Sequence, residues 1–228
     1  MYKFETHLHT NACSACAVST PQEIIAAAVE NNYAGLVITN HFYHGNTSVV
    51  RNLPWEEFVD AYEQDYLELK RLGEEHGIIV FFGVEEGFAP GREMLIFGIE
   101  PKTFKEHPEF IMMSAKEKSD FVHKNGGVCV CAHPFRERDY IPEPNVAPDP
   151  NLFDGIEGYN FCNKNDENEK AMIYALNNGK FITAGSDCHH SDLFGHAGIA
   201  FKRPVKNYQT FIKKLKNGEF SLVTPHNL

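Results

Sequence analysis

The sequence lacks any run of 18 or more apolar residues, so it predicts no transmembrane helix. At its N-terminus it also lacks the basic segment followed by an apolar segment that marks a secretory signal. These two absences argue against a protein that crosses or enters a membrane. We therefore expect a soluble, cytoplasmic protein without a membrane partner.

Positive charge is also scarce. The chain has 21 Lys and Arg residues against 31 Asp and Glu residues, which gives a formal net charge of −10. A field of this sign disfavours non-specific binding to the phosphate backbone of a nucleic acid. An anionic substrate would need local cations or metal ions to offset this field.

The six cysteines do not form the repeated C-x-x-C pairs of a zinc ribbon, because only Cys13 and Cys16 have that spacing. Cys129 and Cys131 alternate with valines, as small buried hydrophobic residues do. We expect all six to be reduced thiols. Cys13 and Cys16 fit this expectation least well, because they closely follow His9.

The length of 228 residues suits one domain, 1–228, with a full core. Two capping boxes, Thr20 to Glu23 and Ser114 to Glu117, mark helix starts. Strands are predicted at 2–5, 33–39, 78–84, 94–99, 128–132, 154–159, 181–185 and 198–201, and helices at 21–31, 55–75, 114–125, 167–178 and 208–217. This alternation predicts an α/β fold.

Side chains of the metal-ligand type follow most of these strands. His7 and His9 lie two positions apart in an extended segment and therefore face the same side. The other candidates at strand exits are His41, Glu85, His133, Asp187 and His189. A closed barrel brings the carboxyl ends of all its strands to one mouth, whereas an open sheet gathers fewer of them. We therefore expect an α/β barrel.

Five histidines and two carboxylates exceed the four ligands of one tetrahedral zinc ion. They suffice for two or three divalent ions (Zn, Mn or Fe), with Glu85 or Asp187 as a bridge. Taken singly, each residue has an ordinary alternative. His133 could end a strand, Glu85 could pair with a lysine and Asp187 could cap a helix. The joint pattern favours a metal centre.

The sequence resembles the PHP (polymerase and histidinol phosphatase) domain family in five motifs, which match in order and spacing over nearly the full length. They are His7-Leu-His9, Ile38-Thr-Asn-His41, Gly83-Val-Glu85, Ala132-His-Pro-Phe135 and Gly185-Ser-Asp-Cys-His189. The resemblance implies a distorted (β/α)7 TIM-like barrel and a metal-dependent phosphoesterase. It also implies that the seven candidates above are metal ligands and that Arg136 contacts phosphate.

Three positions depart from the family pattern. Asn40 stands where an aspartate is usual, and Ser14 stands where many members have an acidic residue or a histidine. Glu93 lies where many members have a histidine, and could replace it as a ligand. These departures affect the binding of a third metal ion more than the binding of the first two.

Our hypothesis is hydrolysis of a small phosphorylated substrate, a phosphomonoester, by a metal-bridging hydroxide. Arg136 or Arg138 would bind the phosphate, and His190 or His44 would protonate the leaving alcohol. One alternative is an amidohydrolase, whose site commonly needs a lysine after a central strand, whereas Lys164 lies beyond Asn160. Another alternative is a non-catalytic metal-binding barrel module.

Overall fold

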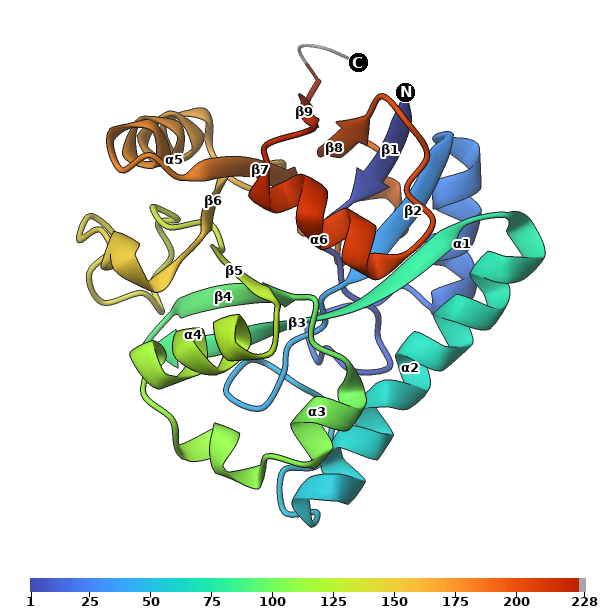
Figure 1. Cartoon of the computed structure of the whole chain (residues 1–228), viewed down its shortest axis with the longest axis horizontal. Helices are drawn as coiled ribbons and strands as arrows, with labels where there is room; N and C mark the ends of the chain where they lie inside the picture. The colour runs from blue at the N-terminus through green and yellow to red at the C-terminus, as the bar shows by residue number, and fades with distance from the viewer. Residues whose placement is uncertain (226–228) are drawn as a thin grey trace.

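A nine-stranded sheet curls through the centre of the protein in the computed structural model, which describes residues 1–225 (Figure 1). The strand order is β7-β6-β5-β4-β3-β2-β1-β8-β9. The strands are β1 (Tyr2–Glu5), β2 (Tyr33–Ile38), β3 (Ile79–Ala89), β4 (Arg92–Phe97), β5 (Val128–Cys131), β6 (Gly155–Asn160), β7 (Phe181–Gly185), β8 (Gly198–Phe201) and β9 (Ser221–Val223).

The sheet nearly closes on itself between the ends of β1 and β7. Leu8, just after β1, forms a parallel bridge with Cys188, just after β7. The amide of His9 donates to the Cys188 carbonyl at 2.9 Å, and the amide of Asp187 donates to the His7 carbonyl at 2.8 Å. Seven strands thus form a barrel, with β8 and β9 added beside β1. The predicted α/β barrel is confirmed.

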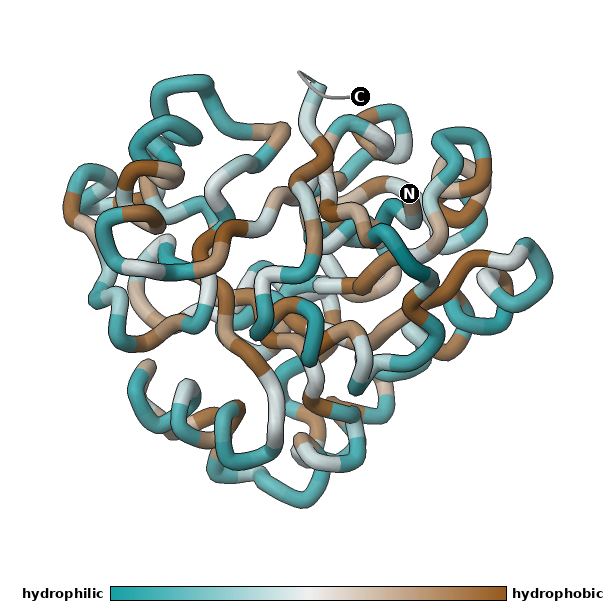
Figure 2. The backbone as a smooth tube through the Cα atoms, turned by 45° about the horizontal axis from the view of Figure 1, so that its top comes forward, coloured by the Kyte–Doolittle hydropathy of each residue, from teal (hydrophilic) through white to brown (hydrophobic). Residues whose placement is uncertain are grey.

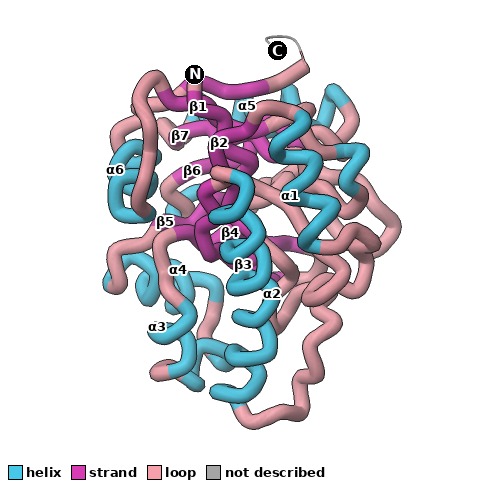
Figure 3. Tube along the Cα trace, turned by 90° about the vertical axis from the view of Figure 1, so that its right-hand side faces the viewer, coloured by secondary structure: helices cyan, strands magenta, loops and turns pink. Residues whose placement is uncertain are grey.

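Helices surround this sheet on the outside (Figure 3). They are α1 (Pro21–Glu30), α2 (Trp55–His76), α3 (Pro101–Lys105), α4 (Ala115–Lys124), α5 (Asn165–Asn177) and α6 (Tyr208–Lys216), with short 3-10 turns at Pro108–Met112, Pro150–Leu152 and Ser191–Leu193. Both predicted capping boxes are formed, at the starts of α1 and α4. Within residues 1–225, no helix is both long and apolar enough to cross a lipid bilayer.

An apolar cluster fills the part of the barrel that lies before the candidate ligands. Phe4 lies in β1, ahead of His7, and Phe81 lies in β3, ahead of Glu85. Both rings pack against Phe211 of α6, with centroids 5.7 and 5.3 Å away. Figure 2 shows hydrophobic segments running through the centre and hydrophilic segments on the outer turns. This packed core holds the strand ends in fixed positions.

The largest difference from the prediction concerns β3. The predicted strand ended at 84, because two glutamates follow, but β3 continues to Ala89 and pairs antiparallel with β4. Glu85 and Glu86 stay in the strand because both are buried with partners on opposite faces. A tight turn at Gly91, with φ of +66°, replaces the helix that strict alternation would require. The barrel is therefore distorted, with β4 antiparallel to both of its neighbours.

Candidate metal centre

Glu85 lies at the middle of a cluster of four imidazoles. Its Oε1 atom is 3.2 Å from His7 Nε2 and 3.1 Å from His133 Nε2. Its Oε2 atom is 2.9 Å from His41 Nδ1 and 3.4 Å from His9 Nε2. The carboxylate is fully buried. One carboxylate thus reaches four ring nitrogens from three separate strand ends, those of β1, β2 and β5, which is the arrangement that a bridging ligand requires.

Asp187 is the second carboxylate of the cluster. Its Oδ1 atom lies 3.2 Å from His9 Nε2, 3.4 Å from His7 Nε2 and 3.5 Å from His189 Nδ1. The backbone of Asp187 has a φ of +54°, and that of His133 a φ of +28°. Non-glycine residues rarely adopt these angles, which concentrate at functional sites.

Glu93 also reaches the cluster, from β4. Its Oε1 atom is 3.2 Å from His41 Nδ1, and its Oε2 atom is 3.6 Å from His133 Nε2. All eight residues predicted as ligands therefore converge at one end of the barrel. Four groups of three have one potential ligand atom per residue within 4.8 Å of the others: His9, His41 and His189; His7, His9 and Glu85; His7, His133 and Asp187; and His41, Glu85 and Glu93.

Several donor atoms in this cluster are buried without a hydrogen bond. His7 Nε2, His9 Nε2, His41 Nδ1 and Glu85 Oε2 have no hydrogen-bond partner anywhere in residues 1–225. Each such group costs about 1–3 kcal/mol in lost solvation. Cations bound between these residues would satisfy the four atoms, and imidazole with carboxylate suits Zn, Mn or Fe. The donor set therefore fits divalent metal ions.

A second layer of polar groups orients His7. Its Nδ1 atom is 2.8 Å from Glu157 Oε1, and the other Glu157 oxygen accepts bonds from the His133 amide and the Asn160 side chain. Such carboxylates fix the tautomer of a ligating histidine. The sequence analysis missed Glu157. The signal that could have found it was a carboxylate in the interior of the predicted strand 154–159.

Ser14 and Asn40, two of the residues that depart from the family pattern, form a similar layer of polar groups around His9. Ser14 Oγ lies 3.0 Å from His9 Nδ1 and donates to Asn40 Oδ1 at 2.9 Å. Asn40 Nδ2 in turn donates to Asp65 Oδ2 of α2 at 2.6 Å. Burial raises the pKa of Asp65. The carboxylate missing at position 40 is thus supplied from a helix, one hydrogen bond further from the cluster.

The cluster shifts the protonation of its own members. Burial opposes ionisation of Glu85, but the charges of His7 and His41 hold its pKa well below the usual range. Burial and the neighbouring His41 lower the pKa of His9. Burial alone would raise the pKa of Cys16, yet hydrogen bonds from His189 and His41 lower it to about 6. Protons therefore compete with metal ions for these atoms.

A cavity of about 370 Å³ opens beside the cluster, and its lining includes Arg136, Tyr140 and Asn46. Arg136 is 8% exposed. Its Nη2 atom donates to Asp187 Oδ2 at 2.5 Å and its Nε atom to Asn163 Oδ1 at 2.8 Å. The guanidinium group is therefore held at the wall of the cavity, where a phosphate could meet it.

The other predicted contacts lie elsewhere. Arg138 donates to Glu167 and to the Cys162 carbonyl. His44 binds Glu86, on the opposite face of β3. His190 is exposed, because the chain turns away after His189 into a 3-10 turn. Of the residues described, these three are absent from the cavity lining. The structure thus brings Arg136 to the cluster and does not bring His190 there.

Comparison with known proteins gives a partial family match. A family model described as PHP-associated matches residues 165–220. No curated protein sequence is similar enough to count as a match.

Solved structures share the fold at low sequence identity. A protein from Bifidobacterium adolescentis assigned as a metal-dependent phosphoesterase has a TM-score of 0.60 and 14% identity, over 93% of this chain and 96% of that chain. A two-domain protein from Bacteroides vulgatus, containing a predicted PHP-like metal-dependent phosphoesterase, has a TM-score of 0.72 and 13% identity, over 98% of this chain and 64% of that one. An amidohydrolase from Chromobacterium violaceum, solved with sulfate and no metal, has a TM-score of 0.61 and 15% identity, over 99% of both chains. The family match and the shared fold together confirm the resemblance to the PHP domain family.

Proposed function

We propose that this protein is a metal-dependent hydrolase that cleaves a small phosphomonoester. The observation that carries the proposal is Glu85, whose two oxygens face four imidazoles at 2.9–3.4 Å. We propose as ligands His7, His9, His41, Glu85, Glu93, His133, Asp187 and His189, which together could hold two or three divalent ions (Zn, Mn or Fe).

Such ions, when bound, generate a nucleophile from water near neutral pH and neutralise charge on a phosphoryl group. The residues of the chain supply the rest. Glu157 fixes the His7 ring through its 2.8 Å contact with Nδ1. Arg136 is held by Asp187 and Asn163, so its guanidinium group is preorganised to bind a phosphate oxygen.

The cavity of about 370 Å³ suits the phosphoryl end of a small molecule. Tyr140, which is 64% exposed, lies at its wall, so the alcohol portion would extend past this ring towards solvent. His190 stays a proposed proton donor only for a leaving group that reaches beyond the cavity to the surface. A His190→Ala variant with unchanged turnover of every substrate would exclude that role.

The role of Arg136 is tested by turnover of p-nitrophenyl phosphate and a panel of small phosphomonoesters. We expect Arg136→Ala to lower kcat/KM about 100-fold, while its metal content stays that of the wild type. Arg138→Ala is the matched control, because Arg138 bonds to Glu167 and a backbone carbonyl instead. Unchanged kcat and KM in Arg136→Ala would show that this residue does not bind the phosphate.

Two other functions remain as alternatives. The shared fold of the C. violaceum amidohydrolase favours cleavage of a C–N bond. Lys164, the lysine that lies beyond Asn160, is exposed and paired with Glu137. Turnover of an amide panel but no phosphoester would favour the amidohydrolase. Full metal occupancy without turnover of either panel would favour a non-catalytic binding module.

We also propose that the chain folds as a single domain and works in the cytoplasm. All six cysteines are free thiols in the part of the chain that the structure describes. Free thiols persist in reducing compartments. Fractionation of the native cell with an antibody to the chain would test the location.

A further inference from the structure

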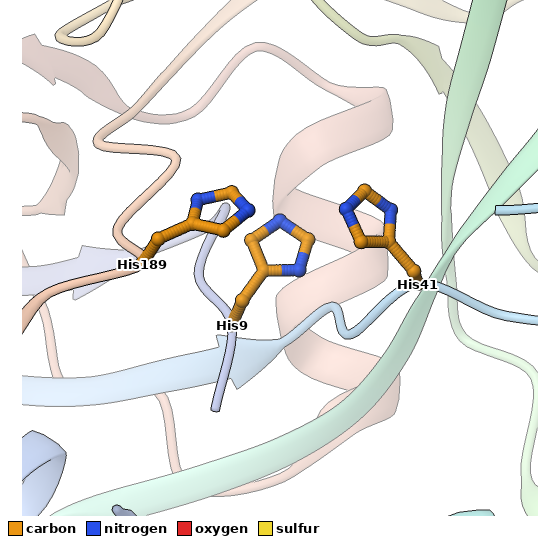
Figure 4. Close-up of side chains that lie close together, drawn as sticks. All are labelled: His9, His41 and His189. Atoms are coloured by element: carbon orange, nitrogen blue, oxygen red, sulfur yellow. The ribbon is translucent and has the colours of Figure 1, made fainter. Parts of the chain in front are cut away.

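Cys16 lies beside the imidazole cluster, on the loop that follows β1. Its Sγ atom is 3.1 Å from His189 Nε2, and its side chain lines the same cavity as His41 and His189. Figure 4 shows the ring of His9 between those of His189 and His41, and the centroid distances from His9 are 4.3 and 4.5 Å. One nitrogen from each of these three rings lies within 4.8 Å of the others.

A second observation concerns His41, which is only 7% exposed and lines the same cavity. Its Nδ1 atom lies 2.9 Å from Glu85 Oε2 and 3.2 Å from Glu93 Oε1, yet it has no hydrogen-bond partner within the described residues, as expected of a buried donor that binds a cation. His9 faces Glu85 and Asp187 through Nε2, at 3.4 and 3.2 Å. His9 Nε2 is therefore directed towards these carboxylates, whereas His189 Nε2 lies beside the sulfur of Cys16 and His41 lines the same cavity.

Ser14 does not supply the missing ligand, although it stands where many PHP members have an acidic residue or a histidine. Its hydroxyl group is occupied by His9 Nδ1 at 3.0 Å, by the His41 amide at 3.0 Å and by Asn40 Oδ1 at 2.9 Å. The side chain is fully buried beneath the rings. Cys16, two residues later, instead lines the cavity.

We propose that the Cys16 thiolate binds one of the metal ions together with His41 and His189. This inference rests on the metal centre of the proposed function and adds a ligand to it. Cysteine sulfur and imidazole are tetrahedral zinc ligands, and three protein ligands leave a position open for water or substrate. A thiolate also selects zinc over manganese, which prefers oxygen ligands. The ion at Cys16 is therefore of the zinc type, whatever the other ions are.

The experiment replaces the native metal with Co²⁺ in the full-length chain and records the near-ultraviolet absorption from thiolate-to-cobalt charge transfer. We expect the wild type to show this band and Cys16→Ser to lose it, with cobalt content lower by about one ion per chain. The matched control is Cys162→Ser, because Cys162 is half-buried near Asp187 but its thiol donates to the Asp187 backbone carbonyl and not to an imidazole. The control should keep both the band and the cobalt.

Alkylation of the wild-type chain gives a second measurement that needs no substitution. Iodoacetamide should modify Cys16 in the metal-free chain, and Zn²⁺ should protect Cys16 against it, as mapped by mass spectrometry. A wild-type chain without the band, an equal band in Cys16→Ser, or equal alkylation with and without Zn²⁺ contradicts the proposal. A band without phosphoester turnover overturns only the proposed function, and turnover without a band overturns only the role of Cys16.

Discussion

Asn40 donates a hydrogen bond from Nδ2 to Asp65 Oδ2 over 2.6 Å, and both side chains are buried. Asp65 also accepts a bond from Thr10 Oγ1 at 2.7 Å. The usual aspartate of the PHP pattern at position 40 would place two carboxylates face to face here. Asn40 and Asp65 therefore form a buried pair in which an amide, and not a second carboxylate, faces the Asp65 carboxylate.

Asn40→Asp should consequently destabilise the chain, although it restores the family pattern. Loss of the bond and repulsion between buried carboxylates should lower the free energy of unfolding at pH 7 by about 1–3 kcal/mol. Urea denaturation of the metal-free protein measures this change. The double variant Asn40→Asp with Asp65→Asn should recover most of it. A single variant as stable as the wild type would refute the coupling.

Glu157→Gln tests the orientation of His7. The amide keeps the shape of the side chain but weakens the hold on His7 Nδ1, so we expect metal affinity to fall about 10–100-fold. Competition with a chromogenic chelator measures that affinity. The control is Glu109→Gln, which removes an exposed carboxylate 2.7 Å from His107 Nδ1. Equal affinities in the two variants would mean that Glu157 has no role in metal binding.

Glu85→Gln should remove more metal than any other single substitution, because it replaces the carboxylate that faces four imidazoles. We expect the loss in affinity to exceed the roughly 100-fold limit typical of second-layer residues. Glu86→Gln is the neighbouring comparison, since Glu86 bonds Lys118 on the other face of β3. If both variants kept their metal, Glu85 would not be a bridging ligand.

Glu5 gives the chain a predictable dependence on pH. Burial raises its pKa to about 7, although the backbone amides of Thr6, His7 and Ser186 donate to it. Between the ordinary value of 4.5 and about 7, the folded chain keeps a proton that the unfolded chain has lost. The contribution to stability is therefore complete below 4.5 and is lost as the pH rises through 7.

Glu5→Gln should remove this dependence. From pH 4.5 to 7.5, the wild type should lose about 3 kcal/mol of unfolding free energy more than the variant. Denaturant titrations of the metal-free chains across this range provide the comparison. The same pH slope in both chains would show that Glu5 titrates normally in the folded state.

The sequence alone predicted the barrel and the end of the barrel at which most candidate ligands lie, because the ends of strands can be recognised from local patterns. His7 and His9 share a face through strand periodicity, and Asp187 follows a strand that ends at a glycine. These patterns depend only on residues close together in the sequence, so they can be recognised without knowing which strands pair.

Other parts depend on contacts between distant residues, which one sequence does not reveal. Glu157 lies 150 positions from His7, and Asp65 lies on a helix whose polar face gives no sign of Asn40. The predicted end of β3 at residue 84 was wrong. Two consecutive glutamates usually mark the end of a strand, and only their buried partners show that the strand continues. The predicted roles of Arg136 and Arg138 were separable only once Asp187 and Glu167 were placed.

The central claim is that residues from His7 to His189 bind a shared group of cations. Elemental analysis of the purified full-length chain beside His7→Ala tests it most directly. We predict two or three divalent ions per wild-type chain and a clear loss in the variant, with circular dichroism unchanged. Less than one ion per wild-type chain, or equal metal in both proteins, would contradict the account.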